Sequence, residues 1–235
     1  MHYMPITFPF FIAFWFLFGL LAALIQIGIL EYAFESMGVS RRYMFSLLIL
    51  CLAGSYINIP IARLPGEHVP ASHVVDFWGM RYVVPVMVNS PGTVIAVNVG
   101  GAIIPCVLSI YLIAKHRLYL RALVAVFIVT LVVNHEARVV PEMGVAVPIF
   151  VPPIITAVVA LLISPRSAAP LAYVAGSLGT LIGADLLNLN RIRDLGAPVA
   201  SIGGAGKFDG IFLTGLVAVL LAGLFGGRRR VQPAW

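Results

Sequence analysis

Long runs of apolar residues, separated by short polar segments, dominate the pattern of this chain. A helix of about 20 apolar residues crosses the roughly 30 Å hydrocarbon layer of a membrane. Seven runs approach that length, at about Phe8–Leu30, Tyr43–Ala62, Thr93–Ala114, Tyr119–Val133, Val145–Ser164, Pro170–Leu189 and Phe208–Gly226. The pattern therefore predicts an all-α, polytopic transmembrane bundle of about seven spans, forming a single transmembrane domain over residues 1–235.

Two of these runs allow a different path. The fourth is the shortest, and the fifth contains Pro148, Pro152 and Pro153. Broken helices occur in membranes where protein or a cavity covers them. Either run is therefore a candidate for a re-entrant segment.

The longest polar connection, from Arg63 to Gly92, contains the stretch HVVDFWGMRYVVPVMV. Side chains alternate in character on both sides of Trp78-Gly79, which is typical of a β-hairpin. We expect a small hairpin here or an extended cap over the bundle. No internal repeat is evident, which weakens the case for a transporter built from inverted repeats.

Composition supports the membrane assignment. Hydrophobic residues make up 61% of the chain and charged residues 10%, whereas soluble domains are about a quarter charged. The net charge of +6 does not indicate nucleic acid, because the basic residues stand near the predicted helix ends, where they meet anionic headgroups. The expected partner is the lipid bilayer. Cys51 and Cys106 lie in apolar runs and are expected to be buried free thiols.

Seven spans would place the two termini on opposite faces of the membrane. One face would receive nine basic residues and two acids, and the other six basic residues and seven acids. The nine are Arg41, Arg42, Lys115, Arg117, Arg121, Arg166, Arg228, Arg229 and Arg230. The positive-inside rule then makes this first face cytoplasmic, with the amino terminus outside and the carboxyl terminus inside.

Small residues recur four apart on the last two runs. The sixth run carries Ala175, Gly179 and Gly183, and the seventh carries Gly210, Thr214, Ala218 and Ala222. Such ridges let membrane helices approach closely. We expect these two ridges to pack together, and close packing alone would explain the glycines.

Close packing does not explain two aspartates. Asp185 ends the sixth run, and Asp209, within the glycine-rich stretch GGAGKFDG, begins the seventh, so antiparallel spans would place both at similar depth. A carboxylate in the membrane costs about 2.5–3.5 kcal/mol on insertion scales, so it usually has a task or a partner. Two carboxyls close together in a low dielectric cannot both ionise, and they could act as general acid and general base around a water.

Helix geometry limits this catalytic pair. Asp185 lies some 200° around the helix from Gly183. The pair therefore requires the sixth helix to unwind at its end, or to pack through Ser177, Thr180 and Ala184. The alternative is that a basic residue neutralises each aspartate; the candidates are Arg191, Arg193 and Lys207.

Other polar residues near membrane depth are candidates for a cavity or a substrate path. His135-Glu136 begins a zinc motif, but Val139 stands where the second histidine is required. A loop metal site from His68, His73, Asp76, His135 and Glu142 is less favoured than a solvated network, so we expect neither a metal nor a cofactor. The candidates for lining a cavity or substrate path are Gly183, Gly204, Gly206, Gly210, Asn98, Asn134, His135 and Glu136.

The stretches AVNVGGAIIP, NHEARVVPEMGVAVPIFVPP, IGADLLNL and GGAGKFDGIFLTG together resemble a family of prokaryotic integral membrane proteins catalogued as a domain of unknown function (DUF1614). This resemblance implies a multi-pass protein of the prokaryotic cytoplasmic (inner) membrane. GAD and GAGKFDG are also similar to the two aspartate motifs of intramembrane aspartyl proteases. That similarity implies catalytic roles for Asp185 and Asp209 near the cytosolic side, opposite to the face on which the charge count places them. Lys207 and Phe208 interrupt the G-x-G-D pattern, and no Pro-Ala-Leu motif follows.

Three classes of function remain open. The first is an intramembrane aspartyl protease-like hydrolase acting on a helix of another membrane protein. The second is a transporter or channel for a small solute, cation or proton, in which the prolines break the fifth helix at a binding site. The third is a non-catalytic accessory subunit that uses its acids for contacts with partner subunits.

Overall fold

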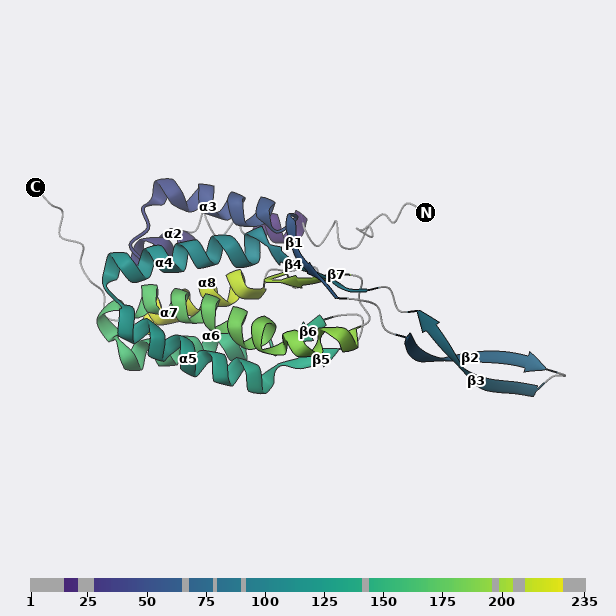
Figure 1. Cartoon of the computed structure of the whole chain (residues 1–235). Helices are drawn as coiled ribbons and strands as arrows, with labels where there is room; N and C mark the ends of the chain where they lie inside the picture. Colours follow the sequence, from purple (N-terminus) through teal and green to yellow (C-terminus); the bar gives the residue numbers. More distant parts are fainter. Residues whose placement is uncertain are drawn as a thin grey trace, which may run out of the picture.

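The computed structural model is mostly helical, with a small sheet at one end (Figure 1). It describes residues 15–20, 28–64, 68–77, 80–89, 92–140, 144–195, 199–204 and 210–225. The α-helices are α2 (Ile29–Ser36), α3 (Arg41–Gly54), α4 (Ile104–His116), α5 (Tyr119–Glu136), α6 (Val151–Ile163), α7 (Ala168–Thr180) and α8 (Gly210–Phe225). Tighter or wider helical turns flank them, namely η1 (Val99–Ile103), η2 (Pro165–Ser167), η3 (Leu181–Asp185) and η4 (Leu186–Leu195).

Three helical stretches are long and apolar enough to cross a membrane, namely Val99–His116, Tyr119–Glu136 and Pro165–Leu189. Shorter apolar helices cover Arg42–Gly54, Val151–Ile163 and Thr214–Leu224. The helical character is thereby confirmed and membrane association is supported, while the number of seven crossings stays a prediction. Residues 8–14 and 21–27 of the first predicted span lie outside the described residues.

A three-stranded sheet replaces parts of two predicted spans. Its order is β1 (Asn58–Arg63), β4 (Val94–Asn98), β7 (Val199–Ile202), with β1 antiparallel and β7 parallel to β4. The second and third spans were therefore wrong where they included β1 and β4. Both strands are short apolar runs rich in Ile and Val, and hydrophobic periodicity cannot separate such runs from buried helix.

The predicted hairpin is present. Strands β2 (His68–Phe77) and β3 (Met80–Asn89) pair antiparallel, and their last pair, Phe77 with Met80, brackets Trp78-Gly79. Figure 1 shows this hairpin extending beyond the bundle, so the alternative of a cap over the bundle is wrong. Its backbone lies on the same side of the molecule as the three-stranded sheet.

The fifth predicted span begins later than expected. A second, very short hairpin, β5 (Arg138–Val140) with β6 (Gly144–Ala146), precedes α6. Pro152 and Pro153 lie in the first turn of α6, where the missing backbone N–H of proline leaves no helical hydrogen bond unmade. The prolines therefore start this helix, and the expectation that they break it is wrong. The fourth run is an unbroken helix, α5, of 18 residues.

Successive helices run in opposite directions, so their ends gather at two levels (Figure 1). The end that carries β1, β4 and β7 is called the sheet end below, and the other the opposite end. At the opposite end, Lys115 Nζ donates to the Gly38 carbonyl oxygen, and Arg121 Nη1 donates to Ser164 Oγ at 3.3 Å. These bonds connect turns between helices, and the predicted topology places all of these turns on one face of the membrane.

Helix α7 is the centre of the bundle, with every residue from Ala168 to Ser177 buried. A Cβ on Gly176 would lie 3.2 Å from Gly215 Cα, so α7 and α8 pack closely, as predicted. Two of the predicted residues face another helix, however. A Cβ on Gly179 would lie 2.6 Å from Val129 Cγ1, and one on Gly183 would lie 2.7 Å from the Thr130 carbonyl oxygen, so this ridge faces α5.

Candidate functional site

The two parallel strands of the sheet each lead into a pair of glycines. Strand β4 ends at Asn98, ahead of Val99-Gly100-Gly101, and β7 ends at Ile202, ahead of Gly203-Gly204. Because β4 and β7 run in the same direction, with Val97 paired to Ile202, both turns leave the sheet at the same edge. The candidate site lies at this edge.

Asn98 connects three segments of the sheet end. Its Nδ2 donates to the Ser55 carbonyl oxygen at 2.7 Å and to Asn58 Oδ1 at 3.0 Å. Its Oδ1 accepts the Gly101 N–H at 2.8 Å, which caps the start of η1. Asn58 Oδ1 also accepts from Ser201 Oγ at 2.5 Å. With only 3% of Asn98 exposed, this network fixes β1, β4 and β7 relative to η1.

Exchanging this amide for a carboxylate should therefore be costly. Asn98→Asp keeps the bond to Gly101 but turns both donated bonds into contacts between acceptor oxygens. We expect a loss of about 2–4 kcal/mol in the free energy of unfolding, because buried groups are left unsatisfied. The measurement is thermal or denaturant unfolding of the purified protein in detergent.

Asn58→Asp is the matched control for this prediction. Asn58 is exposed and its Oδ1 accepts both of its described bonds. The same chemical change should therefore alter stability by less than about 0.5 kcal/mol. Equal losses in both variants would contradict the role assigned to the Asn98 amide.

Asp185 lies at the end of η3 and is half-buried. Its Oδ2 accepts the backbone N–H of Gly203 at 2.6 Å. The stretch η3 is π-helical, continuing directly from α7, and such wider turns are frequent at functional sites. The side chain thus ties the end of α7 to the turn that follows β7.

The conformation of Gly203 makes this contact possible. Its φ is +79°, in the left-handed region that favours glycine. A Cβ here would lie 2.6 Å from Ala102 Cβ and 2.7 Å from Ala102 N. The turn therefore fits directly against η1, and Asp185 lies where η1, η3 and β7 meet.

The first turn of α8 belongs to the same neighbourhood. Ile211 forms a small buried cluster with Leu181 at the start of η3, Ile202 at the end of β7, and Ala102 in η1. The helix that follows the glycine-rich loop therefore starts beside the stretch that carries Asp185. Asp209 and Gly206 themselves lie outside the described residues, and Gly210 is the first residue of α8.

The remaining candidates fall into two groups. Gly183 is a contact between η3 and α5, and Gly204 follows the Asp185-bound turn, where a Cβ would lie 3.5 Å from Asn98 Cβ. Asn134 Oδ1 accepts from Asn188 Nδ2 at 3.4 Å, and Asn188 also donates to the Ala184 carbonyl oxygen at 2.9 Å. His135 is exposed and Glu136 half-buried at the end of α5.

The sequence did not single out four residues that form hydrogen bonds with the candidate residues or within their network, namely Asn58, Asn188, Ser201 and Gly203. A signal for two of them is present in the printed sequence. Asn98-Val99-Gly100-Gly101-Ala102 and Ser201-Ile202-Gly203-Gly204-Ala205 are a repeated five-residue pattern, and in both copies a strand leads into paired glycines. For metals, the described part of the chain holds no group of three or more His, Cys, Asp or Glu side chains suited to an ion.

Fold and composition define the class as a mostly helical protein with membrane-length apolar helices and a small sheet at one end. Within that class, the chain belongs to the family described as "Protein of unknown function (DUF1614)", whose model matches residues 52–221. The match includes the sheet, Asn98, Asp185 and the start of α8. No curated protein and no solved structure matches the chain.

Proposed function

We propose that this chain is an intramembrane hydrolase of the aspartyl protease type, with Asp185 and Asp209 as its carboxyl pair. The observation that carries the proposal is the 2.6 Å bond between Asp185 Oδ2 and the Gly203 N–H. It holds one carboxyl against the loop that leads to Asp209. The contact of Ile211 with Leu181 supports the same juxtaposition, since these residues flank the two aspartates in sequence.

The chemistry requires one ionised and one protonated carboxyl. The carboxylate takes a proton from a water, whose oxygen attacks the carbonyl carbon of the peptide bond. The protonated partner donates its proton to the carbonyl oxygen, giving a tetrahedral diol intermediate. When the C–N bond breaks, the leaving nitrogen takes the proton from the first carboxyl. A hydroxyl of the diol returns its proton to the second carboxylate, so that both carboxyls regain their starting forms.

The geometry of the sheet end favours this chemistry over a purely structural role. Gly203 packs against Ala102, and its N–H holds Asp185 Oδ2 at this edge of the sheet. Asn58, Asn98 and Ser201 supply polar groups near the same edge, which suits the entry of water. The substrate class is accordingly a helix of another membrane protein.

The proposal includes a location. The basic residues Lys115, Arg117 and Arg121 lie at the opposite end, and the positive-inside rule then makes that end cytoplasmic. The sheet end, with Asp185, would face the outside of a prokaryotic inner membrane. The amino terminus would be outside and the carboxyl terminus inside.

Reconstituted full-length protein with labelled single-span peptides tests the proposal. Asp185→Asn and Asp209→Asn should each reduce cleavage at least about 10³-fold, because either change removes the acid–base division. Glu35→Gln, an exposed acid on α2 at the opposite end, should retain full activity. Product formation is followed by gel and mass spectrometry.

Two results would overturn the proposal. One is cleavage that persists in both aspartate variants. The other is an absence of cleavage together with proton- or cation-driven flux in the same liposomes, which would assign the acids to transport. Co-purification of the inactive chain in fixed stoichiometry with a partner would instead indicate an accessory subunit.

A further inference from the structure

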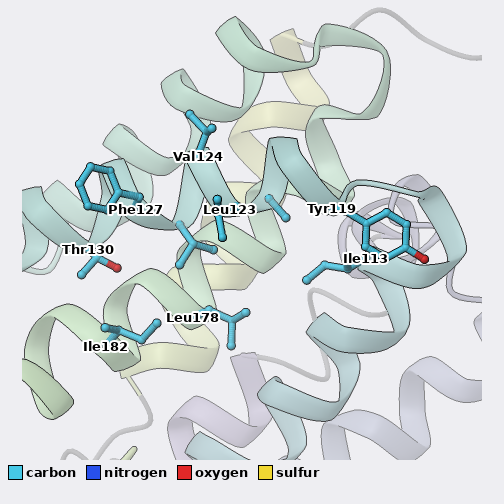
Figure 2. Close-up of a pocket in the computed structure, with 10 residues that line it drawn as sticks. Ile113, Tyr119, Leu123, Val124, Phe127, Thr130, Leu178 and Ile182 are labelled. Atoms are coloured by element: carbon cyan, nitrogen blue, oxygen red, sulfur yellow. The ribbon is translucent and has the colours of Figure 1, made fainter.

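An apolar groove opens between α4 and α5 on the outside of the bundle (Figure 2). Both helices pack against α7 but touch each other little, so residues of α7 and η3 form the floor. Ile113 lies on one wall, Leu123 and Phe127 on the other, and Leu178 and Ile182 below. The groove has a volume of about 600 Å³.

The lining indicates what kind of molecule fits. Its hydroxyl groups belong to Tyr119, at one end, and Thr130, at the other. Thr130 Oγ1 donates a hydrogen bond to the Gly179 carbonyl oxygen at 3.5 Å, so this hydroxyl proton is not available to a ligand. Leu123 and Phe127 are 68% and 62% exposed on a helix of membrane length. This lining therefore matches a hydrocarbon.

The length of the groove separates an acyl chain from a transmembrane helix. Tyr119 and Thr130 are eleven residues apart on α5. At about 1.5 Å per residue this spans about 16 Å, roughly half of the 30 Å hydrocarbon layer. One leaflet has that depth, so the groove suits a lipid chain entering from the opposite end.

A basic residue lies in the turn between the two helices that form this groove. Arg117 lies between α4 and α5, two residues before Tyr119, and is exposed. Within the described residues its guanidinium forms no hydrogen bond or ion pair, whereas neighbouring Lys115 and Arg121 donate to Gly38 and Ser164. A phosphate could therefore bind Arg117 without displacing a contact to another described residue.

The backbone at Arg117 strengthens this assignment. Its φ is +52°, and no other described non-glycine residue has a positive φ. Helices usually end in glycine at such a position, because a side chain there is strained. An arginine held in a strained conformation is an observation from which a functional role can be inferred.

From these features we infer that the groove binds an anionic phospholipid. One acyl chain lies along Leu123, Phe127 and Leu178, and the phosphate meets Arg117. The negative headgroup and the apolar chain match the two parts of the site. This site is at the opposite end from Asp185 and does not depend on the proposed hydrolysis.

The test is native mass spectrometry of the full chain in detergent, titrated separately with dioleoyl-phosphatidylglycerol and dioleoyl-phosphatidylcholine. The wild-type protein should bind the anionic lipid about tenfold more tightly. Arg117→Gly should reduce that preference about fivefold, the expected share of one basic residue at a membrane surface. Glycine accepts the left-handed conformation, so the melting temperature in phosphatidylcholine should be unchanged or higher.

Two controls make the result specific. Arg166→Ala removes an exposed charge at the same end and should change the preference less than twofold. Leu123→Trp fills the groove and should weaken binding of the anionic lipid about fivefold by excluding its chain. Leu120→Trp, at a residue 73% exposed and outside the groove lining, should have no effect.

Several outcomes would overturn the inference. Equal binding of the two lipids would remove the headgroup site. Equal effects of Arg117→Gly and Arg166→Ala would assign the preference to overall charge. Equal effects of the two tryptophan variants would place the acyl chain elsewhere, and a lipid-excluding dimer would assign the groove to a second copy of the chain.

Discussion

Replacing Gly100 with alanine should lower the free energy of unfolding by at least about 4 kcal/mol, the range reached only when a core contact is broken. A Cβ at this position would overlap the Cys51 carbonyl oxygen and the Ser55 backbone nitrogen, and would lie 2.6 Å from Ser55 Oγ. The first two are backbone atoms of α3 and its C-terminal end, so no side-chain rotation relieves the overlap. Helix α3 would have to separate from η1.

Thermal unfolding in detergent measures this effect, with Gly19→Ala as the control. Gly19 is helical, and a Cβ added there would have nothing within 4 Å. Alanine there should be neutral or stabilising by up to about 1 kcal/mol, because it favours helix. Similar stabilities for the two variants would contradict the close backbone contact between α3 and η1.

The hydrophobic runs predicted most of the helical layout, because a membrane-length apolar run such as Pro170–Leu189 permits few other structures. They failed at β1 and β4. There, a helix and a strand lie next to each other within one apolar run. The pattern of apolar and polar side chains does not indicate where the helix ends or the strand begins. The Trp78-Gly79 hairpin was predictable because its turn and its alternation are local features.

The candidate site was predictable in part. Asp185 and Asn98 attracted attention because polar groups in apolar runs need partners. Their partners were not predictable from local pattern, since Asn58 lies 40 residues from Asn98 and Gly203 lies 18 residues from Asp185 in the chain. Only the sheet, whose strands come from three distant segments, brings them together.

The geometric objection to a carboxyl pair has a structural answer. Asp185 was expected to point away from the ridge that carries Gly183, and the ridge was expected to face α8. The ridge faces α5 instead, while Gly176 contacts Gly215 of α8. Asp185 Oδ2 accepts a hydrogen bond from Gly203 in the turn that follows β7, and the wider turn of η3 occurs where unwinding was required.

Gly203→Ala is expected to disable the site while leaving most of the bundle folded. The positive φ costs a non-glycine residue about 1–2 kcal/mol, and contact with Ala102 adds about 1–3 kcal/mol. To relieve both, the turn must move away from η1, which breaks its bond to Asp185. If Asp185 and Asp209 act as proposed, a displacement of about 1 Å should reduce cleavage about 10²-fold.

Gly28→Ala separates strain from contact in this experiment. Gly28 has a similar φ of +75°, but nothing lies within 4 Å of its Cβ position. Its substitution should cost only the strain, about 1–2 kcal/mol, with cleavage unchanged. Unfolding and cleavage measured on both variants decide the matter. Gly203→Ala should lose more stability and more cleavage activity than Gly28→Ala. If the losses were equal, backbone strain alone would explain them, and the turn at Gly203 would not be what holds Asp185 in place.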